Sequence, residues 1–202
     1  MKDNDSLREY REKRDFDQTG EPAGEGKTAS EKPVFVIQKH DASNLHYDFR
    51  LEVDGVLKSW AVPKGPSTDP QEKRLAVPTE DHPLDYADFE GVIPAGAYGA
   101  GTVLVWDTGT YRNLREEDGG NPLSMEESYR DGKLAVWLEG QKLRGGYALI
   151  RTNMGGTKNW LLVKERDDQA DARRNPVSTE PNSVISEKSL EEIAAEAQDA
   201  DD

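Results

Sequence analysis

The chain has 202 residues, of which 34% are apolar and 33% are charged, so we expect one folded domain with tails. No apolar run approaches the roughly 18 residues that a membrane-spanning helix needs, and the charged start at residues 1–5 does not match a signal peptide. The absence of cysteine excludes disulfides, thiolate metal sites and cysteine nucleophiles. These features predict a soluble, cytoplasmic protein.

The net charge of −14 is unevenly distributed along the chain. Residues 166–202 hold 4 basic and 11 acidic side chains, a net charge of −7, whereas residues 33–79 hold 6 of each and are neutral. A neutral region can bind one or two phosphates, but it cannot coat a long duplex through many counterion-releasing contacts. We therefore expect any contact with a polynucleotide to be local.

Residues 1–32 are predicted to form a short helix followed by a glycine-rich arm. Ser6 and Glu9 match a capping box, which predicts a helix that begins near Ser6 and ends at about Lys13 or Arg14. Apolar residues nearly vanish over 17–33, where glycine and proline are frequent. This stretch is predicted to be mobile unless a binding site orders it.

Residues 33–166 are predicted to form a mainly β domain. The alternating segment 45–53 meets Asp54-Gly55, which favours a tight turn into a partner strand at 56–62. Other strands are expected to begin at 34–37 and to cover 73–78, 101–106, 110–113, 133–138, 143–151 and 159–164. Turns are expected at 107–109, 131–132, 139–140 and 153–156, and a tight structural loop at 91–101. About nine short strands without helices between them predict an antiparallel barrel or a strongly curved sandwich rather than a parallel α/β sheet.

The chain after Arg166 is polar and acidic. Ser189 and Glu192 match a second capping box, which precedes an alanine-rich helix of about three turns. Such a helix is too short to be stable alone. Residues 167–202 are therefore predicted to be a flexible acidic tail with a short helix.

Two of the three histidines lie close to an aspartate in segment 40–48. In a strand, His46, Asp48 and Arg50 point to one face, while the apolar residues between them point to the other. His40 lies at the preceding turn and can fold back over the same point. Two imidazoles and a carboxylate suit manganese, iron or zinc and leave coordination positions open. His40, His46 and Asp48 are the predicted metal ligands, with a solvated polar strand face as the alternative.

Positive side chains near this face are candidates for phosphate binding. Arg50 lies one pleat beyond Asp48, where its guanidinium can place two donors on a phosphate held by the metal. Lys64 supplies further positive charge. Lys73 and Arg74 point to opposite faces of a strand, and we expect Arg74 in the site because its planar head can bind a phosphate through two bonds.

His82 has an acidic neighbour that can fix its tautomer, and the following proline holds it extended. It is a candidate general acid or charged transition-state donor. An ordinary surface histidine and a third metal ligand are the alternatives. Gln38 and Glu80 are candidate supporting residues, or merely solvated ones. Tyr86 either packs in the core or directs its hydroxyl at a substrate.

Several motifs extend this pattern. They are, in chain order, Lys13-Arg14-Asp15-Phe16, Thr19-Gly20-Glu21-Pro22, Gln38-Lys39-His40, Leu45-His46-Tyr47-Asp48-Phe49-Arg50-Leu51-Glu52, the segment 54–67, and Glu80-Asp81-His82-Pro83-Leu84. Together they resemble the 3′-phosphoesterase domain of bacterial and archaeal DNA ligase D, over a stretch that ends near Lys164. No ligase or polymerase motif accompanies them, so the chain is expected to be a free-standing member or one excised from a larger protein.

The resemblance implies a manganese-dependent enzyme on a small β-barrel that trims the 3′ ends of DNA primers. Such an enzyme removes a terminal ribonucleoside and then the 3′-phosphate, which leaves a 3′-hydroxyl for end joining. The resemblance implies that Mn²⁺, or another divalent transition metal, is bound by His40, His46 and Asp48. It implies catalytic roles for His82, Tyr86, Arg50 and Arg74, and substrate binding by Arg50, Arg74, Lys64 and Arg14. The implied supporting residues are Gln38, Glu80, Asp15 and Glu21.

Arg14, Asp15 and Glu21 match positions that matter in the family, which implies that the arm closes over the active site. This implication conflicts with the mobility that the composition of the arm predicts. The expected partners are DNA or RNA/DNA primer-template 3′ ends, together with a DNA ligase and end-joining proteins. We expect a monomer without a membrane partner.

Two other functions compete with this one. An iron-dependent oxygenase also uses two histidines and a carboxylate on a β-barrel, here His46, Asp48 and His82, although it has no need of His40 or Arg50. The second is a non-catalytic, metal-stabilised module that binds nucleic-acid ends, which predicts metal-dependent binding without a product.

Overall fold

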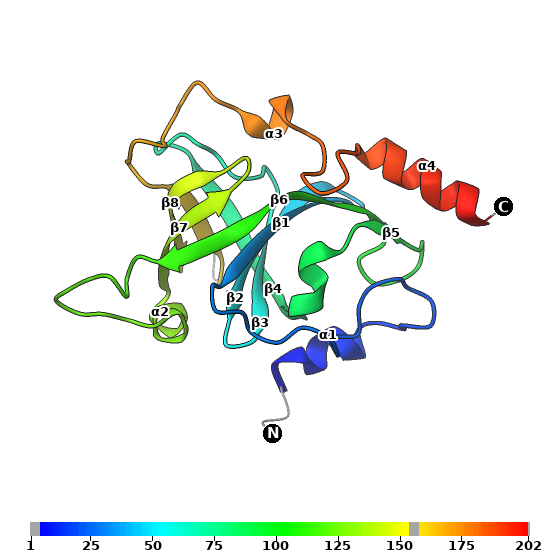
Figure 1. Ribbon diagram of the computed structural model, residues 1–202, viewed down its shortest axis with the longest axis horizontal. Coiled ribbons are helices and arrows are strands. Elements are labelled where there is room, and N and C mark those ends of the chain that lie inside the picture. Colours follow the sequence, from blue (N-terminus) through cyan, green and yellow to red (C-terminus); the bar gives the residue numbers. More distant parts are fainter. Residues whose placement is uncertain (1–4, 154–157, 202) are drawn as a thin grey trace.

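The computed structural model describes residues 5–153 and 158–201, and its main feature is an antiparallel sheet of nine strands (Figure 1). The strands are β1 (Val34–Asp41), β2 (Leu45–Val53), β3 (Val56–Val62), β4 (Lys73–Pro83), β5 (Gly91–Ile93), β6 (Gly101–Asn113), β7 (Lys133–Gly140), β8 (Arg144–Arg151) and β9 (Trp160–Lys164). Their order is β1-β2-β3-β4-β9-β8-β7-β6-β5, and β1 also pairs with β6. Eight strands therefore close into a barrel, which confirms the predicted fold class.

The hairpin between β2 and β3 is formed as predicted. Val53 pairs with Val56, and the two turn residues Asp54 and Gly55 have φ values of 50° and 81°. These positive values are those of a primed turn, whose twist matches that of the flanking strands.

The barrel buries side chains on both of its faces. Its interior holds alternate strand residues such as Phe35, Phe49 and Trp60, all fully buried. A second, smaller core lies on the outer face, where Tyr10 and Tyr86 pack against the sheet. It lies beneath α1 (Arg8–Glu12) and the 3₁₀-helix η2 (Leu84–Asp88). The outward-facing residues of β1 and β2 are therefore covered rather than solvated.

Strand β6 runs through 107–109, where the sequence predicts a turn, so that prediction is wrong. The residues of this segment pair with β1. Ile37 pairs with Asp107 and Gln38 with Val105, which leaves Trp106 as the extra residue of a bulge just before this segment. Gly109 allows close packing, since a Cβ there would lie 2.0 Å from the Glu139 carbonyl oxygen. Aspartate and glycine favour turns, and only the pairing with β1 shows that these residues lie in a strand.

Helix α2 (Met125–Asp131) was not predicted between the strands. It begins with a capping box between Ser124 and Glu127 and ends at Gly132 in the left-handed conformation. The predicted turn at 131–132 is therefore a helix C-cap. The predicted turn at 139–140 instead lies at the end of β7, and that at 153–156 falls largely outside the described residues.

Two further local predictions need correction. The 3₁₀-helix η1 (Asp5–Leu7) precedes α1, so the N-cap of α1 is Leu7, which makes no side-chain capping bond. The segment 91–101 was expected to be loop throughout, but its first residues form β5, which pairs with β6. The capping box of Ser189 and Glu192 is confirmed by two reciprocal hydrogen bonds, of 2.7 and 3.2 Å.

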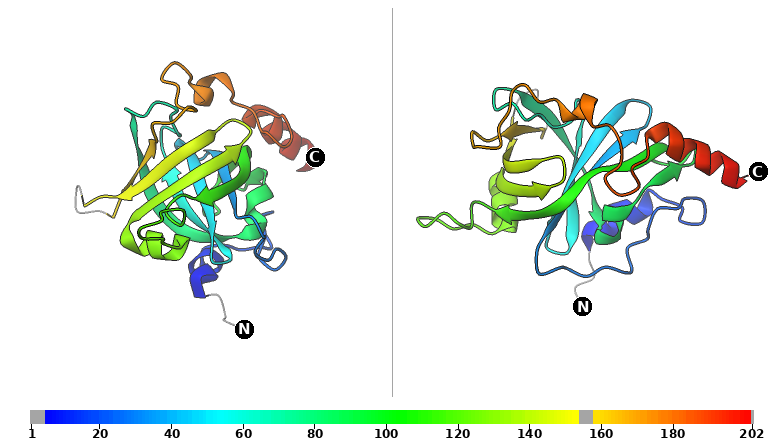
Figure 2. Two further views of the ribbon diagram at one scale, coloured as in Figure 1. Left: turned by 60° about the vertical axis from the view of Figure 1, so that its left-hand side comes forward. Right: turned by 45° about the horizontal axis from the view of Figure 1, so that its top comes forward.

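The chain after Arg166 contacts the barrel, whereas its composition predicts a free tail. It holds α3 (Pro176–Thr179) and α4 (Leu190–Asp201), and passes over one end of the barrel, opposite α1 (Figure 2). Trp106 Nε1 donates to the Glu180 carbonyl at 2.8 Å, and Leu190 and Ile193 are buried. The few apolar residues of this acidic segment are thus the ones that anchor it. None of the described helices is long and apolar enough to cross a membrane.

Candidate metal centre

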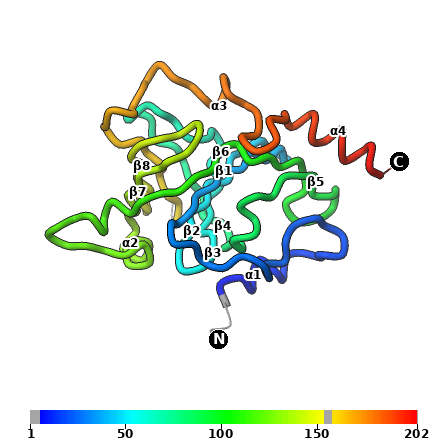
Figure 3. The backbone as a smooth tube through the Cα atoms, viewed as in Figure 1, coloured from blue at the N-terminus to red at the C-terminus, as the bar shows by residue number. Residues whose placement is uncertain are grey.

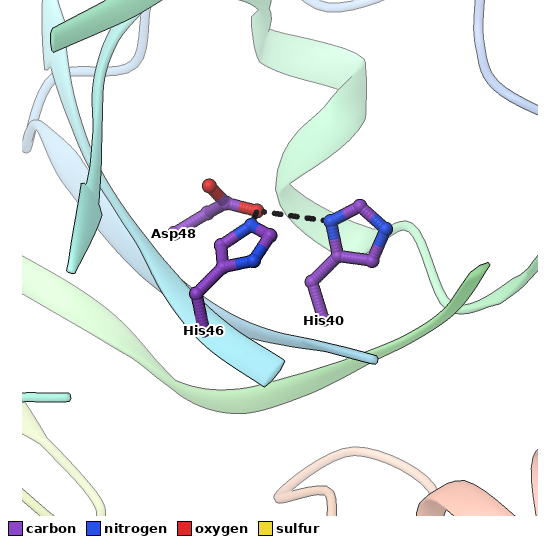
Figure 4. Close-up of side chains that lie close together, drawn as sticks. All are labelled: His40, His46 and Asp48. Atoms are coloured by element: carbon purple, nitrogen blue, oxygen red, sulfur yellow. Dashed lines mark ion pairs between the residues drawn. The ribbon is translucent and has the colours of Figure 1, made fainter. Parts of the chain in front are cut away.

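The predicted metal ligands lie together on the outer face of the barrel (Figure 4). His40 and His46 are a cross-strand pair on β1 and β2, and Asp48 is the next residue along the same face of β2. Asp48 Oδ2 lies 3.5 Å from His40 Nδ1 and 3.3 Å from His46 Nε2. His40 is part of β1 rather than of a turn that folds back. The antiparallel register alone therefore brings the three donors together.

Backbone carbonyls fix the tautomers of both imidazoles. His40 Nε2 donates to the Gly99 carbonyl at 2.8 Å, and His46 Nδ1 donates to the Asn44 carbonyl at 3.0 Å. The other nitrogen of each ring is consequently unprotonated when the ring is neutral, and it faces Asp48. Two free imidazole lone pairs and one carboxylate fit a divalent transition metal, and the carbonyls are the partners that usually orient such ligands.

The charge state of the cluster suits a cation. Burial raises the pKa of Asp48, but the Arg50 guanidinium, together with the favourable contact that either imidazole makes when it is protonated, outweighs this effect and holds that pKa well below its usual value. Burial lowers the pKa of His46, whereas its hydrogen bond to Asp48 raises it, and the net shift is upward. Asp48 is therefore an ionised ligand.

Arg50 lines a cavity beside this cluster and has an unused donor. Its Nε donates to Gln38 Oε1 at 2.8 Å, and Gln38 Nε2 in turn donates to the Tyr86 carbonyl at 2.9 Å. Arg50 Nη2 lies 3.5 Å from Asp48 Oδ2, while its Nη1 is buried and has no hydrogen-bond partner. A buried charged donor without a partner is costly, and an anionic oxygen would satisfy it. Gln38 lies behind Arg50 as a supporting residue.

Arg14 brings a second guanidinium from the N-terminal region. It donates to Glu21 Oε1 at 3.0 Å and to Glu80 Oε1 at 3.1 Å, and its side chain is only 4% exposed. Glu21 also accepts the Tyr86 hydroxyl at 2.9 Å. The arm turns back beside α1 before it enters β1 (Figure 3). Its first part is thus held by buried ion pairs, which corrects the mobility that its composition predicts.

His82 is buried and neutral. Its Nδ1 donates to the Glu80 carbonyl at 2.9 Å, and its Nε2 lies 3.3 Å from Arg14 Nη2, from which it can accept. Burial, followed by the positive charges of Arg50 and Arg14, lowers the pKa of His82 well below its usual value. Both ring nitrogens are engaged away from the metal cluster. This arrangement disfavours His82 as a third metal ligand, and with it the oxygenase triad.

A cavity of about 330 Å³ connects these groups. The predicted residues that line it are Arg14, His40, His46, Asp48, Arg50, Glu80, His82 and Tyr86. Sequence reasoning missed Thr79, Tyr98 and Gly99, which also line it. Thr79 lies next to the point where the pairing of β3 and β4 shifts in register. Tyr98 and Gly99 lie in the loop between β5 and β6, which carries no distinctive motif.

Five predicted residues do not line this cavity. Two of them, Gln38 and Glu21, hydrogen-bond to residues that do, namely Arg50 and Arg14. Lys64 is exposed in the turn that follows β3. Arg74 shares the barrel-facing side of β4 with Ala76 and pairs with Glu72 at 2.6 Å. Asp15 is exposed, and its carboxylate accepts the backbone N–H of Asp17 at 3.1 Å. Lys64 and Arg74 therefore need a substrate that extends beyond the cavity if they are to bind it.

Fold and site together define a closed antiparallel barrel with a candidate metal centre and an anion-binding cavity on its outer face. Residues 38–151 match the family model of the DNA Ligase D 3′-phosphoesterase domain. The match covers more than half of the chain, and the chain belongs to this family.

Three similar proteins support the assignment. The chain is 52% identical over 189 residues to the "Multifunctional non-homologous end joining protein LigD" of Pseudomonas aeruginosa, covering 91% of this chain and 22% of that protein. It is 46% identical over 168 residues to the "Multifunctional non-homologous end joining DNA repair protein LigD" of Mycobacterium tuberculosis, covering 82% and 21%. The Mycolicibacterium smegmatis LigD is 46% identical over 169 residues, with the same coverage. The chain spans about a fifth of the length of these relatives.

Proposed function

We propose that the chain is a metal-dependent 3′-phosphoesterase that trims the 3′ ends of DNA primers, with Mn²⁺ as the metal. It would remove a terminal ribonucleoside and then the 3′-phosphate, which leaves a 3′-hydroxyl. The observation that carries the proposal is the convergence on one cavity of the His40, His46 and Asp48 donors and the Arg50 side chain, which keeps one buried donor without a partner. The family assignment supports the reaction class.

The site meets the main requirements of phosphoryl transfer, which are positioning and charge neutralisation. When bound by His40, His46 and Asp48, a divalent ion would neutralise charge on phosphoryl oxygens. Arg50 Nη1 would donate to a further oxygen of the same phosphate. Such a fixed donor commonly contributes about 10²–10³-fold to the rate. Gln38 prevents Arg50 from turning away.

The structure favours a positioning role for His82. Its neutral Nε2 accepts from Arg14 Nη2 and so orients that guanidinium toward the cavity, together with Glu21 and Glu80. The general-acid role expected from the sequence requires a proton on Nε2, which the lowered pKa of His82 opposes. The Tyr86 hydroxyl is occupied by Glu21, so Tyr86 also acts through this network.

The proposed partners follow from the same site and from the relatives' names. A cavity of this size fits one phosphate at a strand end rather than the length of a duplex. The substrates would be DNA or RNA/DNA primer-template 3′ ends, and a DNA ligase and end-joining proteins would act on the product. A monomer in the cytoplasm remains our prediction.

The test is a labelled primer–template that ends in a ribonucleotide, incubated with Mn²⁺, Mg²⁺, Fe²⁺ or a chelator. We expect shortening of the primer with Mn²⁺ and no reaction with the chelator or with the His46→Ala variant. Primer that stays unchanged in every metal while still being bound would refute catalysis and support the end-binding module instead. Turnover that requires both iron and oxygen would favour the oxygenase.

A further inference from the structure

Tyr98 stands out among the aromatic residues because it is exposed. It lies in the loop between β5 and β6, its exposed fraction is 47%, and it lines the cavity that holds the metal-ligand cluster. The other aromatic side chains of the described residues are buried or partly buried. Exposing an aromatic ring forfeits the free energy of burying it, so its position at this opening calls for an explanation.

We propose that Tyr98 is the platform on which the base of the terminal nucleoside stacks. The inference rests on the proposed function, because it assigns the nucleoside side of a substrate whose phosphate lies at Arg50. Aromatic rings at the entrance of such sites bind bases without reading their sequence, since every base has a π-face. An end-trimming enzyme that must accept any terminal base needs this kind of contact.

The ring of Tyr98 is held in place on several sides. Its hydroxyl donates to Glu80 Oε2 at 3.4 Å, Lys13 Nζ lies 4.9 Å from the ring centroid, and Arg14 Cζ lies 5.3 Å from it. A ring fixed before binding loses little conformational entropy when a base stacks on it.

The loop that carries Tyr98 is tied to the metal-ligand cluster. The carbonyl of Gly99, the next residue, accepts His40 Nε2 at 2.8 Å, which is the bond that fixes the His40 tautomer. Two turns stabilise the loop: the Ala97 N–H donates to the Pro94 carbonyl at 3.1 Å, and the Ala100 N–H donates to the Ala97 carbonyl at 3.2 Å. The distance between the stacking surface and the ligands is therefore set by a short, hydrogen-bonded loop.

The Tyr98 side chain also lies between the cavity and two neighbouring pockets. One is lined by Lys13, Asp15 and Gln18 among others, and the other by Glu9 and Pro78. Tyr98 lines all three spaces. A base at the cavity entrance would lie against this ring, where stacking would hold it.

The experiment compares two fluorescent DNA strands, one ending in 3′-adenosine and one ending in a 3′ abasic ribose. Affinities are measured by anisotropy with a chelator present, so that binding is read without turnover. Wild type is expected to bind the adenosine-ended strand about 5- to 100-fold more tightly than the abasic one, the range typical of one base–aromatic stack. Tyr98→Leu keeps apolar bulk but removes the π-face, and should reduce that ratio to about 1.

Two controls make the result specific. Tyr98→Phe keeps the ring and should restore the preference for the adenosine-ended strand. Ile150→Ala removes another exposed apolar side chain, 39% exposed on β8, and should retain the wild-type ratio. A ratio near 1 in wild type, or an undiminished ratio in Tyr98→Leu, would overturn the inference. Turnover with Mn²⁺ is measured separately, so a failure of the proposed function is distinguishable from a failure of stacking.

Discussion

His40 and His46 show how single residues are prepared for a metal. They present different ring nitrogens to the same carboxylate, because the carbonyls of Gly99 and Asn44 hold the opposite nitrogen of each ring. The alternation along β2 made His46 and Asp48 predictable, since neighbours two apart share a face. The tautomer of His40 was not predictable, because Gly99 lies 59 residues away in the sequence.

Arg50 provides the sharpest test at this scale. We expect Arg50→Ala to lower kcat/KM for a 3′-phosphate end by at least about 100-fold, since it removes a buried, preorganised donor. The matched control is Lys27→Ala, which removes an exposed lysine that pairs with Asp88. Steady-state kinetics with Mn²⁺ measure both variants. Equal losses in the two would show that Arg50 does not contact the reacting phosphate.

At the scale of elements, the bulge in β6 organises the turn between β7 and β8. It places the fully buried Asp107 beneath that turn, where its carboxylate accepts three backbone N–H groups. The bonds from Gln141, Lys142 and Leu143 measure 2.9, 3.1 and 2.8 Å. The sequence suggested a turn at 107–109 because aspartate and glycine favour turns. Only pairing with β1 shows that these residues lie in a strand.

Asp107 is therefore expected to be essential for this part of the barrel. Asp107→Ala should lower the free energy of unfolding by about 3 kcal/mol, because three buried donors lose their acceptor. Asp107→Asn keeps one acceptor oxygen and should lose less. Urea denaturation followed by circular dichroism measures both. If the two variants were as stable as wild type, the turn would have other hydrogen-bond partners.

At the scale of the whole molecule, the C-terminal segment closes one end of the barrel. Lys142, at the β7–β8 turn, reaches across to donate to the Asn182 carbonyl and lies 4.8 Å from the ring of Trp106. Burial lowers the pKa of Lys142 to about 8, against the opposing effect of Asp107 and Glu180. The Lys142 ammonium therefore lies, partly desolvated, between the C-terminal segment and the barrel.

This pKa predicts a pH dependence of stability. The folded-state pKa of about 8 lies below the usual lysine value of 10.5, so the unfolded chain binds more protons than the folded one between these values. The free energy of unfolding that Lys142 contributes should therefore rise with pH in this window. Urea denaturation of wild type and Lys142→Met from pH 7.5 to 10.5 isolates the effect. A difference between the two proteins that does not change with pH would contradict it.

The sequence by itself determined the class of fold, the β2–β3 hairpin and the shared face of His46, Asp48 and Arg50. These depend on strand alternation and turn chemistry, which act over a few residues. Tertiary structure decided the rest. Arg14 and Tyr98 reach the cavity from the segment after α1 and from a loop, and Glu21 of the arm holds Arg14 in place. Arg74 turns away from the cavity on β4. Their contacts join residues up to 85 positions apart, as between Lys13 and Tyr98. Such contacts exist only after the barrel has closed and its outer face is covered.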